Sequence, residues 1–352
     1  MVEYVGVERV RELVGQLGPA RFMRELAAEI EADFGRWESF DKSARHAVHS
    51  PVGVIELMPI SDGRLYSFKY VNGHPSNTAA GLLTVTAFGV LAEVATGYPL
   101  LLAELTLTTA LRTAAMSALA ARRMARPDSR CMALIGNGAQ SEFQAIAFHD
   151  QLGIRELRLF DVDAEATAKL QRNLAGMALE GLTVIACRST AEAVRGADIV
   201  TTVTADKRNA TILTAGMVEA GMHLNGVGGD CPGKTELDRE ILLRPDTRVV
   251  VEYAPQSRIE GEVQQVPADF PLIEFSELVA GRATARRTDA EVTLFDSVGF
   301  ALEDFSALRY LHRLNGAQPG PRGGIDLIPE LANPKDLYGL LRPGLAVRKV
   351  AA

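Results

Sequence analysis

The sequence predicts an α/β protein in which a doubly wound parallel sheet of the Rossmann type is joined to a discontinuous α+β domain. The first observation is an apolar stretch, Cys131–Ile135, that runs directly into the glycine-rich turn Gly136-Asn137-Gly138. The second is the alternation of short apolar segments with helix-like segments, which continues to about residue 315. The third is a Gly- and Pro-rich break over residues 316–324, which ends this unit.

Helices and a meander are expected before this unit. Apolar residues recur at helical spacing between Val7 and Trp37, which predicts two amphipathic helices that divide near Gly18-Pro19. From Val52 to Leu105, short segments rich in Val, Tyr, Phe, Thr and Leu are separated by Asp-Gly and Asn-Gly pairs, a pattern typical of an antiparallel meander. The alanine-rich stretch from Thr108 to Arg126 predicts a helix with a threonine cap.

The strands of the parallel sheet are expected after residue 127. Beyond the strand that ends at Asp161, the alternation predicts five more strands, namely Thr183–Cys187, Asp198–Thr204, Met222–Val227, Arg248–Glu252 and Val292–Ser297. Helices are expected between most of them, among them Ala164–Met177 and Thr190–Arg195. The predicted domains are residues 127–315 for the Rossmann unit and residues 1–126, completed by 316–352, for the other unit.

Composition argues against several classes of protein. The hydrophobic content of 47% and the charged content of 23% are those of a globular protein, and the net charge of −7 argues against a nucleic-acid partner. Three scattered cysteines form neither a disulfide framework nor paired metal-ligand spacing, which indicates a reducing compartment. No apolar run approaches the ~20 residues that span a bilayer, and the first residues lack a signal-peptide pattern. We therefore predict a cytoplasmic protein with no membrane partner.

The glycine-rich turn predicts a dinucleotide site. Glycines let the backbone approach a pyrophosphate, and the following helix directs its N–H groups at the phosphates. Asp161 ends the second strand roughly 20 residues further on, where a carboxylate accepts hydrogen bonds from a ribose diol and repels a 2′-phosphate. NAD is therefore favoured over NADP. Because Ser141 replaces the third glycine, a plain strand-to-helix loop is the alternative, with Asp161 as a cap of the next helix.

The loop from Asn225 to Glu236 carries the strongest candidate for chemistry. Its glycines suggest a backbone pressed against a flat ligand such as a nicotinamide ring, with Asp230 at the edge of that ring. A carboxylate in this position can act as a general base. The alternative is a turn aspartate that bonds to its own backbone.

Three cations and one acid of the first domain need partners: Arg45, Lys69, Arg112 and Glu56. Arg112 is expected in the first turn of its helix, where the dipole disfavours a cation unless an anion, such as a cofactor phosphate or a substrate carboxylate, lies nearby. Glu56, an acid in an apolar strand, suits a substrate ammonium group. Each of the four also has a structural alternative, such as a solvated lysine at position 69. The six histidines show no metal-binding spacing, so no catalytic metal is predicted.

Seven motifs, in order along nearly the whole chain, resemble the ornithine cyclodeaminase/μ-crystallin family. They are residues 40–45, 68–77, 97–99, 111–115 and 295–304, together with Ile135-Gly-Asn-Gly-Ala-Gln-Ser-Glu-Phe143 and Gly226-Val-Gly-Gly-Asp-Cys-Pro-Gly-Lys-Thr-Glu236. The resemblance implies a homodimer that uses NAD to convert L-ornithine to L-proline and ammonia. It also implies a Rossmann domain beside a discontinuous substrate-binding and dimerisation domain.

The resemblance further implies roles for individual residues. Arg45, Lys69 and Arg112 resemble cations that bind the substrate carboxylate, Glu56 an acid beside the reacting amine, Asp230 the catalytic aspartate, and Val298 a residue lining the substrate pocket. We group Asp230, Lys69 and Glu56 as catalytic. The implied NAD contacts are Thr84, Ala139, Gln140, Asp161, Thr204, Val227, Lys234 and Ser297, to which the glycine-rich segments and the alanine-rich helix add Gly136, Gly138, Gly228, Gly229 and Arg112.

Two other functions stay open. An NAD(P)-dependent amino acid dehydrogenase or ketimine reductase of the same family would accumulate or consume NADH, whereas a cyclodeaminase leaves its amount unchanged. A non-catalytic small-ligand binder, as μ-crystallin is thought to be, would keep the fold without turnover, and the presence of Asp230 argues against it. The sequence does not distinguish ornithine from lysine as substrate.

Overall fold

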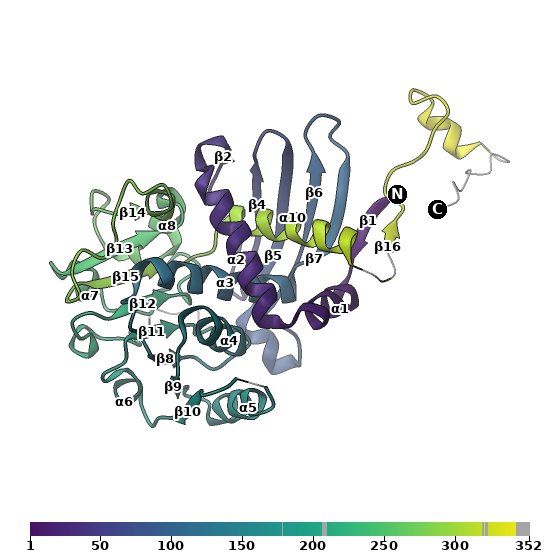
Figure 1. The fold of residues 1–352 in the computed structure, drawn as a ribbon. Coiled ribbons are helices and arrows are strands. Elements are labelled where there is room, and N and C mark those ends of the chain that lie inside the picture. Colours follow the sequence, from purple (N-terminus) through teal and green to yellow (C-terminus); the bar gives the residue numbers. More distant parts are fainter. Residues whose placement is uncertain (178, 206–209, 319, 321–322, 343–352) are drawn as a thin grey trace.

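The structure, a computed structural model, describes residues 1–177, 179–205, 210–318, 320 and 323–342. Within these residues the strands form two eight-stranded sheets (Figure 1). One sheet is parallel throughout, and the other is mainly antiparallel. The predicted combination of a Rossmann-type parallel sheet with an α+β unit is therefore confirmed.

The first sheet contains a long antiparallel meander. Its strands are β1 (Val2–Val5), β2 (Asp41–Lys42), β3 (His46–Ser50), β4 (Gly53–Ser61), β5 (Leu65–Gly73), β6 (Val85–Glu93), β7 (Pro99–Glu104) and β16 (Gly323–Ile325). Strands β4 to β7 pair as consecutive antiparallel neighbours, which confirms the meander expected between Val52 and Leu105. β1 lies parallel to β7, and β16 adds an antiparallel edge strand beside β1. β1 is not among the predicted strands, because four residues are too few to show a clear alternation.

Helices cover one face of this sheet. They are α1 (Val7–Leu17), α2 (Pro19–Gly35), α3 (Thr106–Met124) and α10 (Ala301–Ala317). α10 contacts β4 to β7, α3 contacts β6, and α2 packs on both α3 and α10. The sequence pattern places residues 301–315 with the Rossmann unit, whereas in the structure α10 packs across the first sheet (Figure 1).

The predicted helix boundaries are partly right. α1 and α2 are separated at Gly18, whose φ of 81° is readily adopted only by glycine, so the predicted division is confirmed. The predicted threonine cap of α3 is wrong: the helix begins after Leu105, and the Leu107 N–H donates to the Glu104 carboxylate (2.7 Å). Arg112 therefore lies in the second turn, beyond the range in which a helix dipole acts strongly on a charge.

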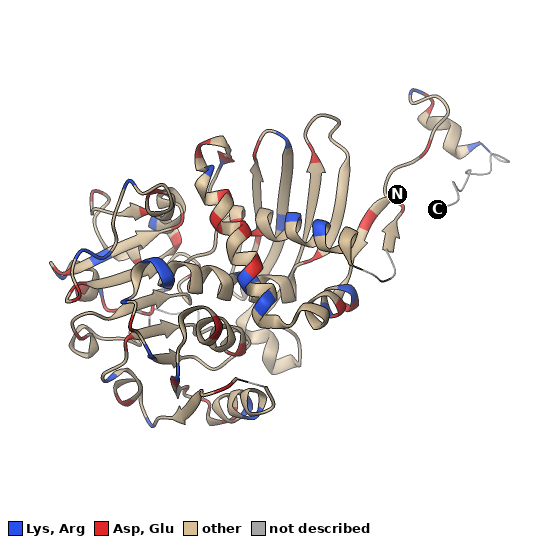
Figure 2. Ribbon diagram, in the orientation of Figure 1, with Lys and Arg blue, Asp and Glu red and all other residues tan. Residues whose placement is uncertain are grey.

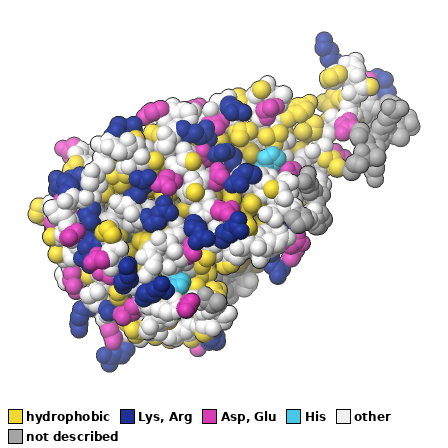
Figure 3. Space-filling view, viewed as in Figure 1, with side chains coloured by type: hydrophobic (Ala, Val, Ile, Leu, Met, Phe, Trp, Pro, Cys, Tyr) yellow, Lys and Arg dark blue, Asp and Glu magenta, His cyan; other side chains and the backbone are white. Residues whose placement is uncertain are grey.

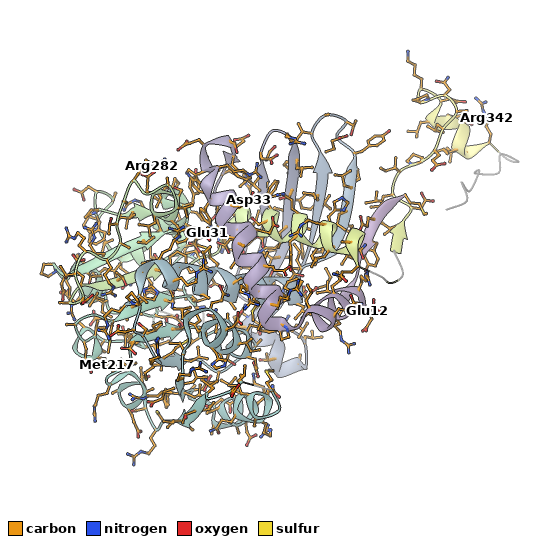
Figure 4. The ribbon with its side chains drawn as sticks, in the orientation of Figure 1. Glu12, Glu31, Asp33, Met217, Arg282 and Arg342 are labelled. Atoms are coloured by element: carbon orange, nitrogen blue, oxygen red, sulfur yellow. The ribbon has the colours of Figure 1, made fainter. Side chains whose placement is uncertain are left out.

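Asp33 fixes α2 to α10. Its buried carboxylate accepts hydrogen bonds from Ser306 Oγ and from Arg309 Nη1, both on α10, at 2.7 Å (Figure 4). Glu31 on the same helix pairs with two arginines of α3, Arg122 and Arg123. These contacts hold α10 in place, and α10 carries two acids of the candidate site described below.

The second sheet and its helices form the Rossmann-type unit. Its strands are β8 (Cys131–Ile135), β9 (Glu156–Phe160), β10 (Thr183–Ala186), β11 (Ile199–Thr202), β12 (His223–Gly226), β13 (Thr247–Val251), β14 (Ile273–Glu274) and β15 (Val292–Asp296). The helices are α4 (Ser141–Leu152), α5 (Ala164–Ala175), α6 (Thr190–Val194), α7 (Arg239–Leu243), α8 (Ala254–Glu260) and α9 (Phe275–Val279). All predicted strands are found, one or two residues shorter at some ends, and the two-residue β14 is an addition.

The order of the parallel strands places a ligand crevice. The sheet runs β10-β9-β8-β11-β12-β15-β13-β14, so the chain moves outward in one direction from β8 to β10 and in the other from β11 to β12. The reversal between β8 and β11 is a topological switch point, where ligands bind beyond the carboxyl ends of the strands in open α/β sheets. The glycine-rich turn follows β8 at this edge.

The remaining short elements and the surface complete the description. Single 3₁₀ turns occur at η1 (Trp37–Ser39), η2 (Pro75–Ala80), η3 (Ala215–Met217), η4 (Glu262–Gln265) and η5 (Leu337–Leu341). The segment with η5 and Arg342 projects away from the rest of the chain (Figures 1 and 4). Acidic and basic residues are interspersed over both units and over the face shown in Figure 3 (Figures 2 and 3). No described helix is both long and apolar enough to cross a lipid bilayer.

Candidate active site

The glycine-rich turn after β8 is shaped by its neighbours. Gly136 has a φ of 94°, and a Cβ at this position would lie 2.8 Å from the carbonyl oxygen of Val203, so only glycine fits. Gly138 differs, because a Cβ there would meet no atom within 4 Å. Ser141 closes the turn by donating from Oγ to the Gly138 carbonyl (2.7 Å). The chain itself thus requires Gly136, whereas the open space at Gly138 leaves room for a ligand.

Asp161 faces this turn from the end of β9. One carboxylate oxygen accepts the Asn137 N–H (2.6 Å), and the other accepts the Asp163 N–H (2.9 Å). The cap of α5 is Asp163, which accepts the Glu165 N–H (2.9 Å). The alternative of Asp161 as the helix cap is therefore wrong, and the structure places Asp161 beside the glycine-rich turn.

The loop after β12 is organised by a buried acid, Glu236. Its carboxylate accepts the N–H groups of Thr204 (2.8 Å) and Gly228 (3.0 Å), and so joins the ends of β11 and β12. A Cβ at Gly228 would lie 2.1 Å from this carboxylate. The loop glycines suggest from sequence a close approach to a flat ligand, whereas in the structure Gly228 makes room for the Glu236 carboxylate.

Two further buried acids anchor Glu236 to the sheet. Asp296, at the end of β15, accepts the N–H groups of Glu262 (2.9 Å) and Val263 (3.0 Å), and Glu262 in turn accepts the N–H of Glu236 (2.7 Å). Burial raises the pKa of Asp296 to about 7, although its two backbone hydrogen bonds oppose the shift. Burial, and then the charge of Asp296, also raise the pKa of Glu262. The loop that carries Asp230 is thus held from behind by a series of carboxylates.

Asp230 projects from this loop with about half of its side chain exposed (51%). Its carboxylate lies 3.4 Å from Lys234 Nζ, which also donates to the Thr204 carbonyl (3.1 Å). Asp230 interacts electrostatically with Arg45 and Glu260, which come from other parts of the chain. It therefore lies at the border between the Rossmann unit and the first sheet.

Arg45 is a buried cation between two buried acids. Its Nη1 lies 3.0 Å from Glu56 on β4, and its Nε lies 3.0 Å from Glu260 at the end of α8. Its Nη2 donates to the carbonyl oxygens of Val298 (2.6 Å) and Gly299 (2.7 Å). Arg45 thus joins the first sheet, α8 and the loop after β15.

Lys69 and Arg112 share acidic partners from α10. Lys69 Nζ lies 2.8 Å from Asp304, and Arg112 pairs with both Asp304 (3.1 Å) and Glu303. Lys69 is only 1% exposed, so the alternative of a solvated lysine is wrong. Burial, and then the charge of Arg112, lower the pKa of Lys69 to about 8, while Asp304 opposes the shift.

The loop after β15 connects these cations to the sheet. Ser297 Oγ and the Gly299 N–H donate to Glu252 at the end of β13 (2.9 and 3.1 Å). Gly299 has a φ of 76°, and a Cβ there would lie 2.7 Å from Arg112 Nη1. Burial, and then the charge of Glu303, raise the pKa of Glu252 to about 8. Glu252 therefore holds the backbone against which two of the cations pack.

The structure brings together most, but not all, of the residues singled out in the sequence. Arg45, Glu56, Asp230 and Val298 form one cluster, joined through Gly299 to Arg112 and Lys69, and Thr204, Val227, Lys234 and Ser297 line the strand ends beside it. Thr84 directly precedes β6, with its carbonyl accepting the His74 N–H (2.8 Å), and no contact between described residues joins it to that cluster. Ala139 and Gln140 lie between the turn and α4, and Gln140 Oε1 is buried with no described hydrogen-bond partner.

Sequence reasoning missed the acids of the site. Those that hold the cations are Glu260, Glu303 and Asp304, and those that hold the loops are Glu236, Glu252, Glu262 and Asp296. A signal existed for Glu252, which stands at the end of a predicted strand, where ligands bind. Glu303 and Asp304 stand in a motif that carries the family resemblance, but nothing in the sequence shows which cations they face.

Comparisons with a protein-family model and with known sequences indicate the same family. Residues 8–316 match the model of the ornithine cyclodeaminase/mu-crystallin family. The chain is 58% identical over 341 residues to an ornithine cyclodeaminase from Brucella suis biovar 1 (strain 1330), which covers 97% of this chain and 94% of that protein.

Solved structures show the same fold. A lysine cyclodeaminase, studied for its recognition of L-lysine, L-ornithine and L-2,4-diaminobutyric acid, superposes with a TM-score of 0.88 at 31% identity, covering 96% of this chain and 99% of that one. An archaeal alanine dehydrogenase dimer with bound NAD superposes with a TM-score of 0.81 at 28% identity, covering 93% and 99% of the two chains.

Proposed function

The chain belongs to the ornithine cyclodeaminase/mu-crystallin family, and we propose that it is an NAD-dependent ornithine cyclodeaminase, which converts L-ornithine to L-proline and ammonia. One observation carries the proposal. Three buried cations converge with Glu56 and Asp230 next to the switch point of a Rossmann-type sheet. An amino acid with a second amine presents one carboxylate and two ammonium groups, and this site contains partners for all three.

The nucleotide crevice suits NAD. Gly138 faces open space at the start of α4, where backbone N–H groups suit a pyrophosphate, and Asp161 suits a ribose diol while repelling a 2′-phosphate. A ring held beside Thr204, Val227 and Ser297 would lie at the strand ends next to the cations. The proposed cofactor contacts also include Thr84, Arg112, Gly136, Ala139, Gln140, Gly228, Gly229 and Lys234.

The chain's own residues then hold the substrate. We place the substrate carboxylate on Arg45, Lys69 and Arg112, whose charges lie in a buried environment where each interaction is stronger than in water. Glu56 lies beside Arg45 and would face the α-amino group, while Val298 would line the pocket through its apolar side chain. This arrangement fixes the α-carbon between the two units.

Asp230 supplies the proton chemistry. NAD held in the crevice would supply reversible hydride transfer at the α-carbon, which would make that carbon open to attack by an amine. Asp230 takes a proton from the distal ammonium, whose ordinary pKa of about 10 keeps it non-nucleophilic at neutral pH. The freed amine closes a five-membered ring at the α-carbon and ammonia leaves. Fixed geometry favours such a closure, with effective molarities on the order of 10⁵ M or more.

The outer face of the first sheet suits a homodimer. Alternation along β4 points Ile55 and Leu57 outward, and both are more than 40% exposed. On the neighbouring strands Tyr70 and Phe88 stack at 5.1 Å on the same face. An apolar sheet face of this kind marks an interface. We propose that residues 1–126, completed by α10 and the residues that follow it, form the substrate-binding and dimerisation domain beside a Rossmann domain of residues 127–300, in a cytoplasmic enzyme.

A charged residue placed on the outer face of the first sheet tests the proposed interface. Leu57→Lys should convert a dimer into a monomer in sedimentation, because a lysine on an apolar interface is buried at a high cost. Leu243→Lys, at a partly exposed apolar position on α7, is the control and should leave the mass unchanged. A wild-type monomer, or a dimer that survives Leu57→Lys, contradicts this part of the proposal.

The activity is tested with ornithine. Purified protein with NAD should release ammonia and proline in equal amounts with no net change in NADH absorbance, whereas an amino acid dehydrogenase would accumulate NADH. Asp230→Asn should abolish proline formation while NAD binding persists, and Asp128→Asn, an exposed aspartate far from the loop in sequence, is the control. Full activity of Asp230→Asn, or stoichiometric NADH, overturns the assignment. A parallel incubation with lysine shows which chain length is preferred.

A further inference from the structure

Glu260 is a buried acid for which the proposed reaction has no stated use. It ends α8, is 4% exposed, and its Oε2 lies 3.0 Å from Arg45 Nε. The angle of this contact is poor, so Oε2 accepts no hydrogen bond from any residue that the structure describes. A buried carboxylate oxygen without such a partner is costly, and at a site for a charged ligand it indicates a missing donor.

Among the described ion pairs of the site, Glu260 is the acid without a cation of its own. Lys69 and Arg112 are matched by the two acids of α10, and Lys234 by Asp230. Arg45 alone faces two buried carboxylates, Glu56 from β4 and Glu260 from α8. One guanidinium cannot neutralise both, so the cluster lacks one positive charge.

The pKa of Glu260 agrees with this excess of negative charge. Burial raises its pKa to about 7, the charge of Arg45 opposes the shift, and the charges of Glu56 and Asp230 add to it. A cation placed beside Glu260 would therefore ionise it and complete the balance. Asp230 interacts electrostatically with both Arg45 and Glu260, so it belongs to the same cluster of charges.

We propose that Glu260 binds the distal ammonium group of a diamino acid substrate beside Asp230, and so makes the site select diamino acids over neutral amino acids. This inference rests on the proposed function. A substrate with an apolar side chain would leave a buried acid unmatched, and a site with an unmatched polar group discriminates strongly against such a ligand.

The test compares two ligands of the same length on the NAD-loaded protein. L-Ornithine and L-norvaline share the carboxylate, the α-ammonium and the chain length, but norvaline lacks the distal amine. Glu260→Gln should weaken ornithine binding on the order of 100-fold and change norvaline inhibition less than about threefold. Glu240→Gln, an exposed glutamate on α7, is the matched control and should change neither.

Each other outcome has a definite meaning. An equal loss for both ligands shows that Glu260 acts only by holding Arg45, and an unchanged ornithine affinity shows no role in binding; either result overturns the inference. If the glutamine variant fails to fold, Glu260→Asp keeps the charge and should still bind ornithine more tightly than norvaline. The wild type should show this preference more strongly at pH 8 than at pH 6. A pH-independent preference overturns the inference. A wild type that forms no proline instead overturns the proposed function.

Discussion

The two halves of the candidate site are built in opposite ways. The cation cluster, defined as Arg45, Lys69 and Arg112, consists of buried charged side chains whose acidic partners lie up to 235 residues away in the sequence. The glycine-rich turn at residues 136–138 consists of backbone from one short segment between β8 and α4, which packs against Val203 and Asp161. The first therefore depends on long-range electrostatic matching, and the second depends on local conformation and on space.

This difference predicts how substitutions affect each half of the site. Removal of one member of a buried ion pair leaves an uncompensated charge, so truncations in the cation cluster should reduce stability as well as activity. A substitution in the turn acts only where the added atoms meet the chain or the ligand. Substitutions in the turn should therefore be able to change ligand binding without changing stability. Substitutions in the cation cluster should reduce both.

The largest effect is expected for Arg45→Ala. This change leaves Glu56 and Glu260 buried without their cation, which should lower the free energy of unfolding by about 3–5 kcal/mol and remove most activity. Urea unfolding measures the loss. Arg24→Ala removes an exposed pair with Asp150 and should cost no more than about 1 kcal/mol. Equal losses for the two variants would end the contrast between a buried cluster and surface pairs.

The glycine-rich turn offers a matched pair of substitutions. Gly136→Ala forces a left-handed conformation and a clash with Val203, and should destabilise the fold by about 1–3 kcal/mol. Gly138→Ala meets no atom of the chain, so its unfolding free energy should stay within about 0.5 kcal/mol of wild type while NAD binds at least tenfold more weakly. Calorimetric titration with NAD and urea unfolding measure the two effects. Undiminished NAD affinity in Gly138→Ala would remove this glycine from the cofactor site.

The pH dependence of activity should follow the charge of Lys69 in the cation cluster. Lys69 has a pKa lowered to about 8, so it is charged below this pH and loses its charge as the pH rises above it. If Lys69 holds the substrate carboxylate, kcat/KM for ornithine should fall up to tenfold per pH unit above about 8. Lys69→Arg keeps its charge at all these pH values and should flatten the decline. An identical decline in both proteins would assign it to another group.

Glu252→Gln is expected to change how the free energy of unfolding depends on pH. Glu252 titrates near 4.5 when unfolded and at about 8 when folded, so the folded state binds more protons between these values. The stability that this group contributes is present below pH 4.5 and is lost as the pH rises to about 8. The variant should lower this slope by at most about 1.4 kcal/mol per pH unit, as measured by urea unfolding between pH 5 and 8. An unchanged slope would show that another acid carries it.

The fold could be predicted from sequence wherever the pattern was local. The alternation after residue 127 predicted the parallel strands, and the helical spacing between Val7 and Trp37 predicted α1 and α2. The threonine cap of α3 was wrong because the Glu104 side chain, one residue before the cap position, makes that contact instead. The position of α10 was wrong because a helix next to a Rossmann strand in sequence can pack on either unit, and only its buried partners, such as Asp33, decide.

The same limit applies to the candidate site. Asp161 was named from its position at the end of the second strand, and Arg112 from its expected place near the start of a helix. Arg45 and Lys69 were assigned roles because they stand in motifs that carry the family resemblance. The acids that match the cations were not, since their pairing depends on which helices and strand ends meet. Glu236 was part of a named motif, yet its role in shaping Gly228 became visible only with both in place.

The sequence by itself determined the Rossmann unit, the glycine-rich turn and the acid that follows it, because their patterns lie within short strand-turn-helix segments. It identified the three cations through the motifs that carry the family resemblance. Tertiary structure alone decided which acid each cation faces, that Lys69 is buried, and that Glu260 is left without a full partner. The physical reason is that charge balance in a buried site is a sum over residues from distant parts of the chain. Only the folded arrangement of α8, α10 and the two sheets brings those terms together.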